Sequence, residues 1–259
     1  MIALAASAWY LPETFVTVAE LPSLSDAERA TCAALGIDRV PADDTLTAAD
    51  LAARAGERAL AAAGLDANDV DVVLTVEPRA PQTLVSSEAT RLQAMLGAGR
   101  AMAFSVGGLG CASLTPALLA ASGLLRADPD LANVLVLHGS KPATPGRYRH
   151  PVTVNGDSGG ALLLRRKGKL RIRDILLETN GAYADLFRVE YRDEEFARWR
   201  EECTDPAVYS FRLAVETRNR LRALATRLLD RNGLSPADVP CYLTQNLSTA
   251  AFRNWPASC

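Results

Sequence analysis

The sequence predicts an α/β fold, and three observations lead to this class. First, 49% of the 259 residues are apolar, which is enough to build a sizeable core. Second, segments with helical periodicity alternate with short runs of Val, Leu and Ile, which are typical of strands inside a sheet. Third, a helix–turn–strand pattern near residue 64 recurs near residue 233, which indicates a duplicated unit.

The expected elements follow one another along the chain. The apolar start, residues 1–10, is predicted to be a strand rather than a signal peptide, because no basic segment precedes it. Thr47 opens the first long helix and Gly64 closes it. We expect further helices at 86–96, 114–125 and 211–231, an exposed insertion with helical character at 190–206, and strands at 70–76, 101–106, 133–137, 160–165 and 170–176. This alternation predicts a mostly parallel sheet.

The duplicated unit is carried by two matching segments. Gly64-Leu65 followed by Asp69-Val70 matches Gly233-Leu234 followed by Asp238-Val239, at one constant separation. In both segments a helix ends at Gly-Leu, a short polar turn follows, and a strand begins. Few residues follow the second marker, so we expect a second half that is incomplete at its C-terminus. Exposed sheet edges and apolar surface would result.

Composition and charge exclude several classes of protein. The formal net charge is −2, and no basic tract with interleaved aromatics occurs, which argues against nucleic-acid binding. No segment is long and apolar enough to span a bilayer, so a cytoplasmic enzyme or binding protein is expected. The five cysteines are widely spaced and form no Cys-x-x-Cys pair. We therefore expect neither a disulfide framework nor a metal site.

Cys111 stands in the segment with the clearest chemical meaning. A predicted strand at 101–106 runs into the turn Gly107-Gly108-Leu109-Gly110, and Cys111 then precedes a helix. Unpaired N–H groups and the dipole at a helix start favour a thiolate, the nucleophilic form of cysteine. Glycines such as Gly110 let a substrate approach the backbone closely. On the motif alone, a buried structural cysteine remains the alternative.

Several segments, taken in order, resemble one enzyme family. They are Tyr10-Leu-Pro-Glu, Gly64-Leu with Asp69-Val-Asp-Val-Val-Leu, Leu92-Gln with Leu96-Gly, Ala103-Phe104 before Cys111, Val134-Leu-Val-Leu, and Gly156-Asp157-Ser158-Gly159-Gly160-Ala161. With them, the chain resembles β-ketoacyl-ACP synthase III over nearly its whole length. The resemblance implies a thiolase-like fold of two pseudo-symmetric βαβαβαββ halves, which we place at 1–166 and 167–259, and a homodimer.

The resemblance also implies a reaction. Cys111 would receive an acyl group from acyl-coenzyme A or an acyl carrier protein and pass it to an acceptor, without a bound cofactor. Such a reaction serves fatty acid biosynthesis, or polyketide and other secondary metabolism. Gly110 and Gly156 would contact the substrate. Arg218 and Arg222, one turn apart on the long helix, would meet an acidic carrier protein or coenzyme A phosphates. A solvated helix face is the alternative for these arginines.

One part of the family's site differs in this chain. The family places a His in a His-Gln-Ala-Asn motif after the second Gly-Leu … Asp-Val unit, where this chain has Gln245-Asn246. Neither His138 nor His150 stands at that place. Gln can donate a hydrogen bond but cannot act as a base near neutral pH, so decarboxylative condensation is not expected. The resemblance thus gives Cys111, Gln245 and Asn246 as the catalytic set.

Two other functions compete with acyl transfer. A catalytically degenerate thiolase-fold subunit with a binding or scaffolding role would explain the missing His. A serine hydrolase is a more distant alternative, because the run from Gly156 to Gly160 matches the loop around the nucleophile of trypsin-like proteases. Those proteases are all-β, so the α/β pattern favours a tight turn before a strand instead.

Overall fold

The computed structural model describes residues 2–21 and 24–243. Its contacts separate the chain into two compact units. The first unit joins Met1–Phe15, Pro41–Ala143 and Gly156–Leu177, and the second joins Val16–Val40, Thr144–Asn155 and Glu178–Cys259. The division into halves at 1–166 and 167–259 stays a prediction.

A six-stranded mixed sheet forms the centre of the first unit, in the order β10-β1-β9-β6-β4-β5. The strands are β1 (Ile2–Tyr10), β4 (Val72–Val76), β5 (Met102–Val106), β6 (Asn133–Ser140), β9 (Ser158–Arg165) and β10 (Leu170–Ile172). β4 runs parallel to β5 and to β6, whereas β9 is antiparallel to β6 and β1, and β10 is antiparallel to β1. The expectation of a mostly parallel sheet is therefore wrong. Parallel pairs need a crossover helix, and no helix lies between β6 and β9.

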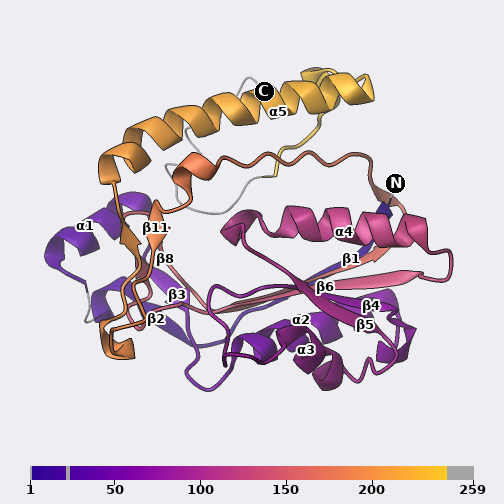
Figure 1. The fold of residues 1–259 in the computed structure, drawn as a ribbon, viewed down its shortest axis with the longest axis horizontal. Coiled ribbons are helices and arrows are strands. Elements are labelled where there is room, and N and C mark those ends of the chain that lie inside the picture. Colours follow the sequence, from indigo (N-terminus) through magenta and orange to yellow (C-terminus); the bar gives the residue numbers. More distant parts are fainter. Residues whose placement is uncertain (1, 22–23, 244–259) are drawn as a thin grey trace. The chain divides into compact units, whose positions relative to one another are not determined.

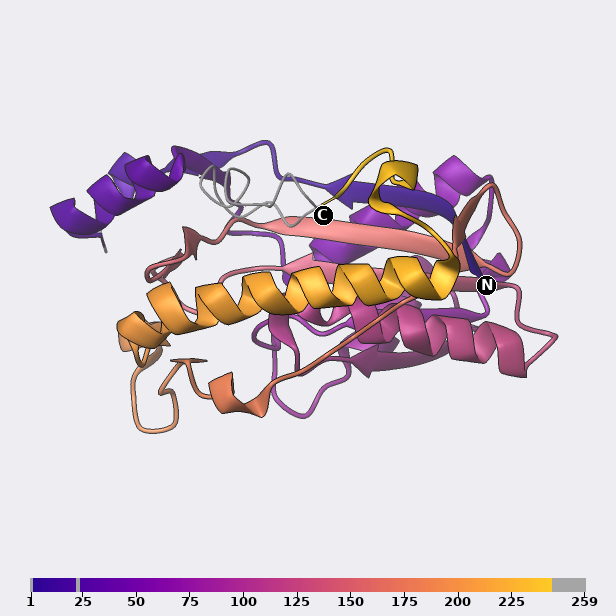
Figure 2. The same ribbon diagram turned by 90° about the horizontal axis from the view of Figure 1, so that it is seen from above.

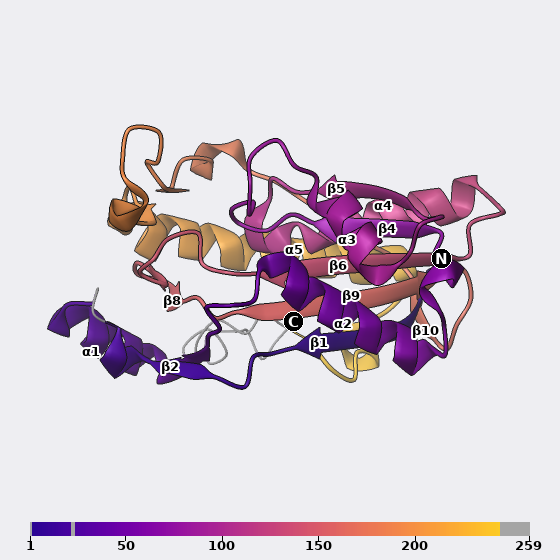
Figure 3. The ribbon, with the colours of Figure 1, turned by 90° about the horizontal axis from the view of Figure 1, so that it is seen from below.

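Helices cover both faces of this sheet. α2 (Ala48–Ala63) and α3 (Glu88–Leu96) lie on one face, which Figure 3 shows from below. α4 (Leu114–Ala127) lies on the other face (Figures 1 and 2). On β6, Leu135 packs in the α2 and α3 layer and its neighbour Val136 packs in the α4 layer. This alternation follows from the two-residue period of a strand that is buried on both faces.

Glycines let α2 lie directly on the strands. The helix begins after Thr47, whose side chain caps its first turn. A Cβ atom at Gly139 of β6 would lie 1.8 Å from the backbone oxygen of Ala48, and one at Gly159 of β9 would lie 1.8 Å from that of Leu51. Only glycine permits this distance, so the two positions fix how closely α2 can approach the sheet.

The second unit is built from shorter elements. They are β2 (Phe15–Thr17), which begins at the unit boundary, α1 (Asp26–Leu35), β3 (Arg39–Pro41), β7 (Tyr148–Arg149), β8 (Thr153–Val154), β11 (Phe187–Arg188), β12 (Glu202–Cys203) and α5 (Ala214–Asn232). A π-helical turn, Val208–Leu213, leads into α5, so the predicted helix at 211–231 is confirmed in its main part. The expected helical character at 190–206 is wrong beyond the single 3-10 turn Phe196–Arg198, since β12 occupies part of that segment.

The duplicated unit is confirmed in its helix and turn. Gly64 ends α2 with φ 64° and ψ 38°, and Gly233 ends α5 with φ 62° and ψ 37°. Each is followed by a 3-10 turn, Ala67–Asp69 in the first copy and Pro236–Asp238 in the second. The strand expected after the second turn is not formed at 241–243, and its remainder lies outside the described residues.

Replacing Gly159 by Ala tests the close approach of α2. The new Cβ would collide with the backbone of Leu51, so we expect the free energy of unfolding to fall by about 1–3 kcal/mol in urea titrations, the usual cost of overpacking. Gly160→Ala is the matched control, because a Cβ at the next residue of the same strand meets nothing within 4 Å. Equal stability of the two variants would contradict the packing described here.

Candidate functional site

The parallel strands β5, β4 and β6 end at one edge of the sheet, named here the carboxyl edge. Val76 at the end of β4 is in register with Val106 at the end of β5 and with His138 on β6. Ser140 of β6 pairs with Ser158, so the antiparallel β9 begins at the same edge. Ligands of open α/β sheets bind at the carboxyl ends of the strands, so the residues that follow these strands are the candidates for a site.

Cys111 lies in the turn that joins β5 to α4. The turn contains the 3-10 segment Gly110–Ala112, which runs directly into the helix at Leu114. The N–H of Ala112 donates to the Leu109 carbonyl at 3.1 Å, and the buried Ser113 hydroxyl accepts the Leu109 N–H at 3.0 Å. The cysteine therefore precedes α4 by one short turn rather than standing in its first turn. Its side chain is exposed, so the alternative of a buried structural cysteine is wrong.

The glycines before Cys111 are required by the backbone and by a neighbour. Gly108 and Gly110 have φ values of 85° and 52°, in the left-handed region that side chains disfavour. A Cβ at Gly107 would lie 2.1 Å from the Glu77 carboxylate, which follows β4. Gly110, predicted to contact the substrate, is thus adjacent to Cys111 in a turn whose backbone conformation requires glycine.

An ion pair between Lys141 and the buried Asp157 lies at the carboxyl edge where β6 ends and β9 begins. Asp157 is fully buried, and the Lys141 Nζ lies 3.1 Å from its Oδ2. The same oxygen accepts the Asp43 N–H at 2.9 Å, and Lys141 donates to the Leu46 carbonyl at 2.8 Å. Asp157 therefore ties β6 and β9 to the loop that leads into α2. Ser158 is the first residue of β9, so no separate tight turn precedes the strand here.

His138 also lies at the carboxyl edge, outside the set of residues that the resemblance gives as catalytic. Its half-buried imidazole sits two residues before the end of β6, with Nδ1 3.1 Å from the Val76 carbonyl oxygen. The family's His motif corresponds to Gln245, far from His138 along the sequence. The signal that could have found it is its position near the carboxyl end of a buried parallel strand.

Comparisons with known proteins place the chain in a family. No protein-family profile matches it. β-Ketoacyl-[acyl-carrier-protein] synthase III of Cereibacter sphaeroides (strain ATCC 17025) is 33% identical over 241 residues, which are 89% of this chain and 72% of that protein. The protein of the same name from Ruegeria pomeroyi is 33% identical over 240 residues, with the same two shares. The chain belongs to the β-ketoacyl-ACP synthase III family. It is therefore a member of a transferase enzyme family.

Solved structures of the synthase III type share its fold. A 2.1 Å crystal structure of 3-oxoacyl-(acyl-carrier-protein) synthase III matches with a TM-score of 0.75 and 26% identity, covering 98% of this chain and 81% of that one. The acyltransferase ChlB3 matches with a TM-score of 0.76 at 19% identity, covering 98% of this chain and 78% of that one. These matches confirm the thiolase-like α/β fold that the sequence predicts.

The other predicted site residues of this synthase III-family chain lie in three different places. Gly156 is half-buried and directly precedes Asp157 at the carboxyl edge, so it lies at the same edge as Cys111. Arg218 and Arg222 are exposed on α5 of the second unit. Gln245 and Asn246 lie outside the described residues.

On α5, two other arginines form ion pairs. Arg220 lies 3.3 Å from Glu178 and 3.6 Å from Glu216, and Arg227 lies 2.9 Å from Glu178. The pairs bring together side chains on one stripe of the helix. Arg218 and Arg222 belong to a different stripe of α5, so the ion pairs do not decide between a docking surface and a solvated face.

The other described cysteines differ from Cys111. Cys32 is fully buried in α1, and this burial, followed by the nearby Glu28 carboxylate, raises the pKa of its thiol. Cys203 is half-buried, and Cys241 is exposed. Of the described cysteines, Cys111 alone combines exposure with a place at the carboxyl edge.

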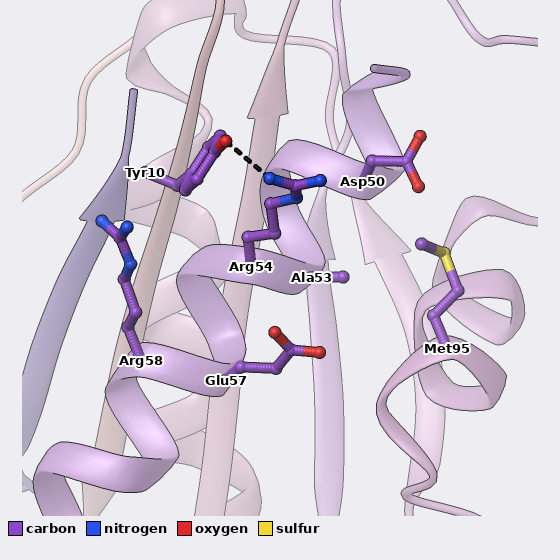
Figure 4. A pocket seen from close by; sticks show the side chains of 7 residues that line it. All are labelled: Tyr10, Asp50, Ala53, Arg54, Glu57, Arg58 and Met95. Carbon is purple, nitrogen blue, oxygen red and sulfur yellow. Dashed lines mark hydrogen bonds between the residues drawn. The ribbon is translucent and has the colours of Figure 1, made fainter. Parts of the chain in front are cut away.

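A groove of about 500 Å³ beside α2 is distinct from this site (Figure 4). Arg54 donates to the Tyr10 hydroxyl at 2.6 Å, and the guanidinium groups of Arg54 and Arg58 each lie 4.9 Å from the centre of the Tyr10 ring. Asp50 and Glu57 balance the two positive charges. None of the predicted site residues lines the groove, and its balanced charge favours no particular ligand.

Within the described residues, no cluster of three His, Cys, Asp or Glu side chains could hold a metal ion. Over the same part of the chain, the helices lack the length and apolar character needed to cross a bilayer.

Removal of the Lys141 charge should destabilise the carboxyl edge. Lys141→Met removes one charged partner of the buried Asp157 carboxylate, so we expect a loss of about 1.5–3 kcal/mol in the free energy of unfolding. Lys167→Met, at an exposed lysine, is the control for the loss of one positive charge. Denaturant titration of both variants would disprove the structural role if their losses were equal.

Proposed function

We propose that Cys111 carries an acyl group between an acyl-coenzyme A or acyl-carrier-protein thioester and an acceptor. The observation that supports this assignment is an exposed thiol at the carboxyl edge, in a glycine-rich turn that leads into a 14-residue helix. The positive end of the α4 dipole lies one turn away. The structure of OleA from Xanthomonas campestris with bound lauroyl-CoA has the same fold, with a TM-score of 0.74 at 15% identity.

The transfer has two steps. The Cys111 thiolate attacks the carbonyl carbon of the donor thioester, the C–S bond to the donor breaks, and the donor leaves as a thiolate. An acceptor then attacks the acyl-Cys111 thioester and releases the cysteine. The N–H groups of Ala112 and Ser113 donate to the carbonyls of Leu109 and Gly110 inside the turn. We therefore assign the Cys111 N–H as a donor to the oxyanion that develops in each step. Gln245 and Asn246 are proposed as further hydrogen-bond donors.

The surface of the chain adds two parts to the proposal. Arg218 and Arg222 would contact an acidic carrier protein or coenzyme A phosphates. The loop before α3 exposes Leu84 at 79% and the whole of Val85, whose φ of 69° is costly for a β-branched residue. Such an apolar tip favours burial against a second copy of the chain. We therefore propose a homodimer, which sedimentation of the wild type and of Leu84→Asp would check.

The location of the reaction is the cytoplasm in this proposal, as the sequence suggests. Fractionation of cells that produce the chain would check it.

Acylation of Cys111 is the direct test of the function. The wild type, incubated with a panel of acyl-coenzyme A thioesters, should gain the mass of one acyl group. Cys111→Ala should lose this adduct entirely, while Cys203→Ala should keep it. An adduct that persists in Cys111→Ala would refute the assignment. A wild type that accepts no acyl group from coenzyme A or carrier protein would support the alternative of a degenerate binding subunit.

Decarboxylation separates simple transfer from condensation. Because Gln245 replaces the family's His, the chain should release no carbon dioxide from radiolabelled malonyl-carrier protein above the level of Cys111→Ala. Release of label that depends on Cys111 would show that condensation persists without that His.

A further inference from the structure

The side chain of His138 points to the face of the sheet that α4 covers. Along β6, Val134 and Val136 pack in the α4 layer, whereas Leu135 and Leu137 pack in the α2 and α3 layer. The two-residue period of the strand therefore turns His138 toward the α4 side. Its neighbour Gly139 points the other way, against the α2 backbone.

The hydrogen bond of His138 selects which nitrogen is basic. Nδ1 lies 3.1 Å from the Val76 carbonyl oxygen, which can only accept a hydrogen bond. In the neutral imidazole, Nδ1 therefore carries the hydrogen and Nε2 carries the lone pair. This arrangement leaves a proton acceptor that is held in orientation by a neighbouring strand.

Open space lies beside the imidazole. Gly160 of β9 is directly paired with His138 and faces the same side, and a Cβ added there would meet nothing within 4 Å. His138 itself is only half-buried. The imidazole of His138 is therefore accessible to a small polar group.

Cys111 belongs to the same edge, and the helix that follows it, α4, covers the face toward which His138 turns. Val106, from which the Cys111 turn departs, is separated from His138 by the single strand β4. With strands about 4.8 Å apart, the two backbone positions lie roughly 10 Å from each other. Cys111 follows Val106 by five residues, so an acceptor that reaches both Cys111 and His138 would lie across the end of β4.

We propose that His138 is the general base that activates the acceptor for acyl transfer from Cys111, the acceptor being a hydroxyl or amine compound. Nε2 takes the proton of the acceptor as its oxygen or nitrogen attacks the thioester carbon. The bond from that carbon to the cysteine sulfur breaks, and the thiolate leaves. The imidazolium then returns the proton to the thiolate or to solvent, so charge and atoms balance. This inference rests on the proposed acylation of Cys111, and it assigns the basic role that Gln245 cannot fill.

The test follows the decay of the acyl-enzyme. Wild type, His138→Asn and His150→Asn are acylated with acyl-coenzyme A, freed of excess donor, and followed by intact mass in buffer, in ethanol-containing buffer and in hydroxylamine. The Asn amide can replace Nδ1 as donor to Val76, but it offers no base. His150, the other histidine of the chain, is exposed in the second unit and serves as the matched control.

The expected result is a selective loss. Transfer to water and ethanol should slow by about 10²-fold or more in His138→Asn, the usual contribution of a general base, and should be unchanged in His150→Asn. Hydroxylamine attacks thioesters without a base, so it should discharge all three proteins at one rate. Imidazole added to His138→Ala should restore part of the transfer to ethanol.

Three other results would contradict the proposal, and they can be told apart. Decay of His138→Asn at the wild-type rate would overturn the role of His138 and leave the acylation of Cys111 intact. Equal slowing with hydroxylamine, or no rescue by imidazole, would assign His138 to the shape of the site and would also overturn it. A wild type that is never acylated would remove the proposed function and this inference with it.

Discussion

The site depends on the direct contact between α2 and the strands β6 and β9. Glycines at positions 139 and 159 remove the side chains that would hold the helix away, and the helix backbone occupies their place. The amino end of α2 is thereby brought to the carboxyl edge, where Lys141 and Asp157 fasten the preceding loop to both strands. Because interiors are close-packed, a shift of α2 would displace the ends of the strands that carry the candidate site.

The carboxyl edge collects side chains from distant parts of the sequence. Cys111 follows β5, Glu77 follows β4, and His138 stands near the end of β6. None of these positions is close to another along the chain, and the parallel register of β5, β4 and β6 brings their strands together. Family membership accounts for the thiolase-like fold. The roles given to His138 and Lys141 are instead argued from the contacts of these residues in this chain.

Much of the fold could be predicted from local patterns. Thr47 and Gly64 mark the ends of α2 because capping chemistry is local, and the same is true of Gly233 at the end of α5. Strand direction could not be predicted in this way, because the antiparallel return of β9 depends on tertiary pairing. The segment at 190–206 differs from the expected helix for a similar reason: its charged residues fit a helix, but β12 pairs with β11 instead. In the site, the Cys111 motif was visible, whereas His138 gains meaning only from its neighbours across the sheet.

Hydrogen bonds within the turn hold the backbone around Cys111 in place. The Ser113 hydroxyl accepts a hydrogen bond from the Leu109 N–H, and the Ala112 N–H donates one to the Leu109 carbonyl. These two hydrogen bonds fix the backbone on both sides of the thiol. A donor thioester that arrives at this turn does not have to order the nucleophile's backbone. The binding free energy of the donor is then available for its own orientation, which is the larger entropic obstacle when two reactants must meet.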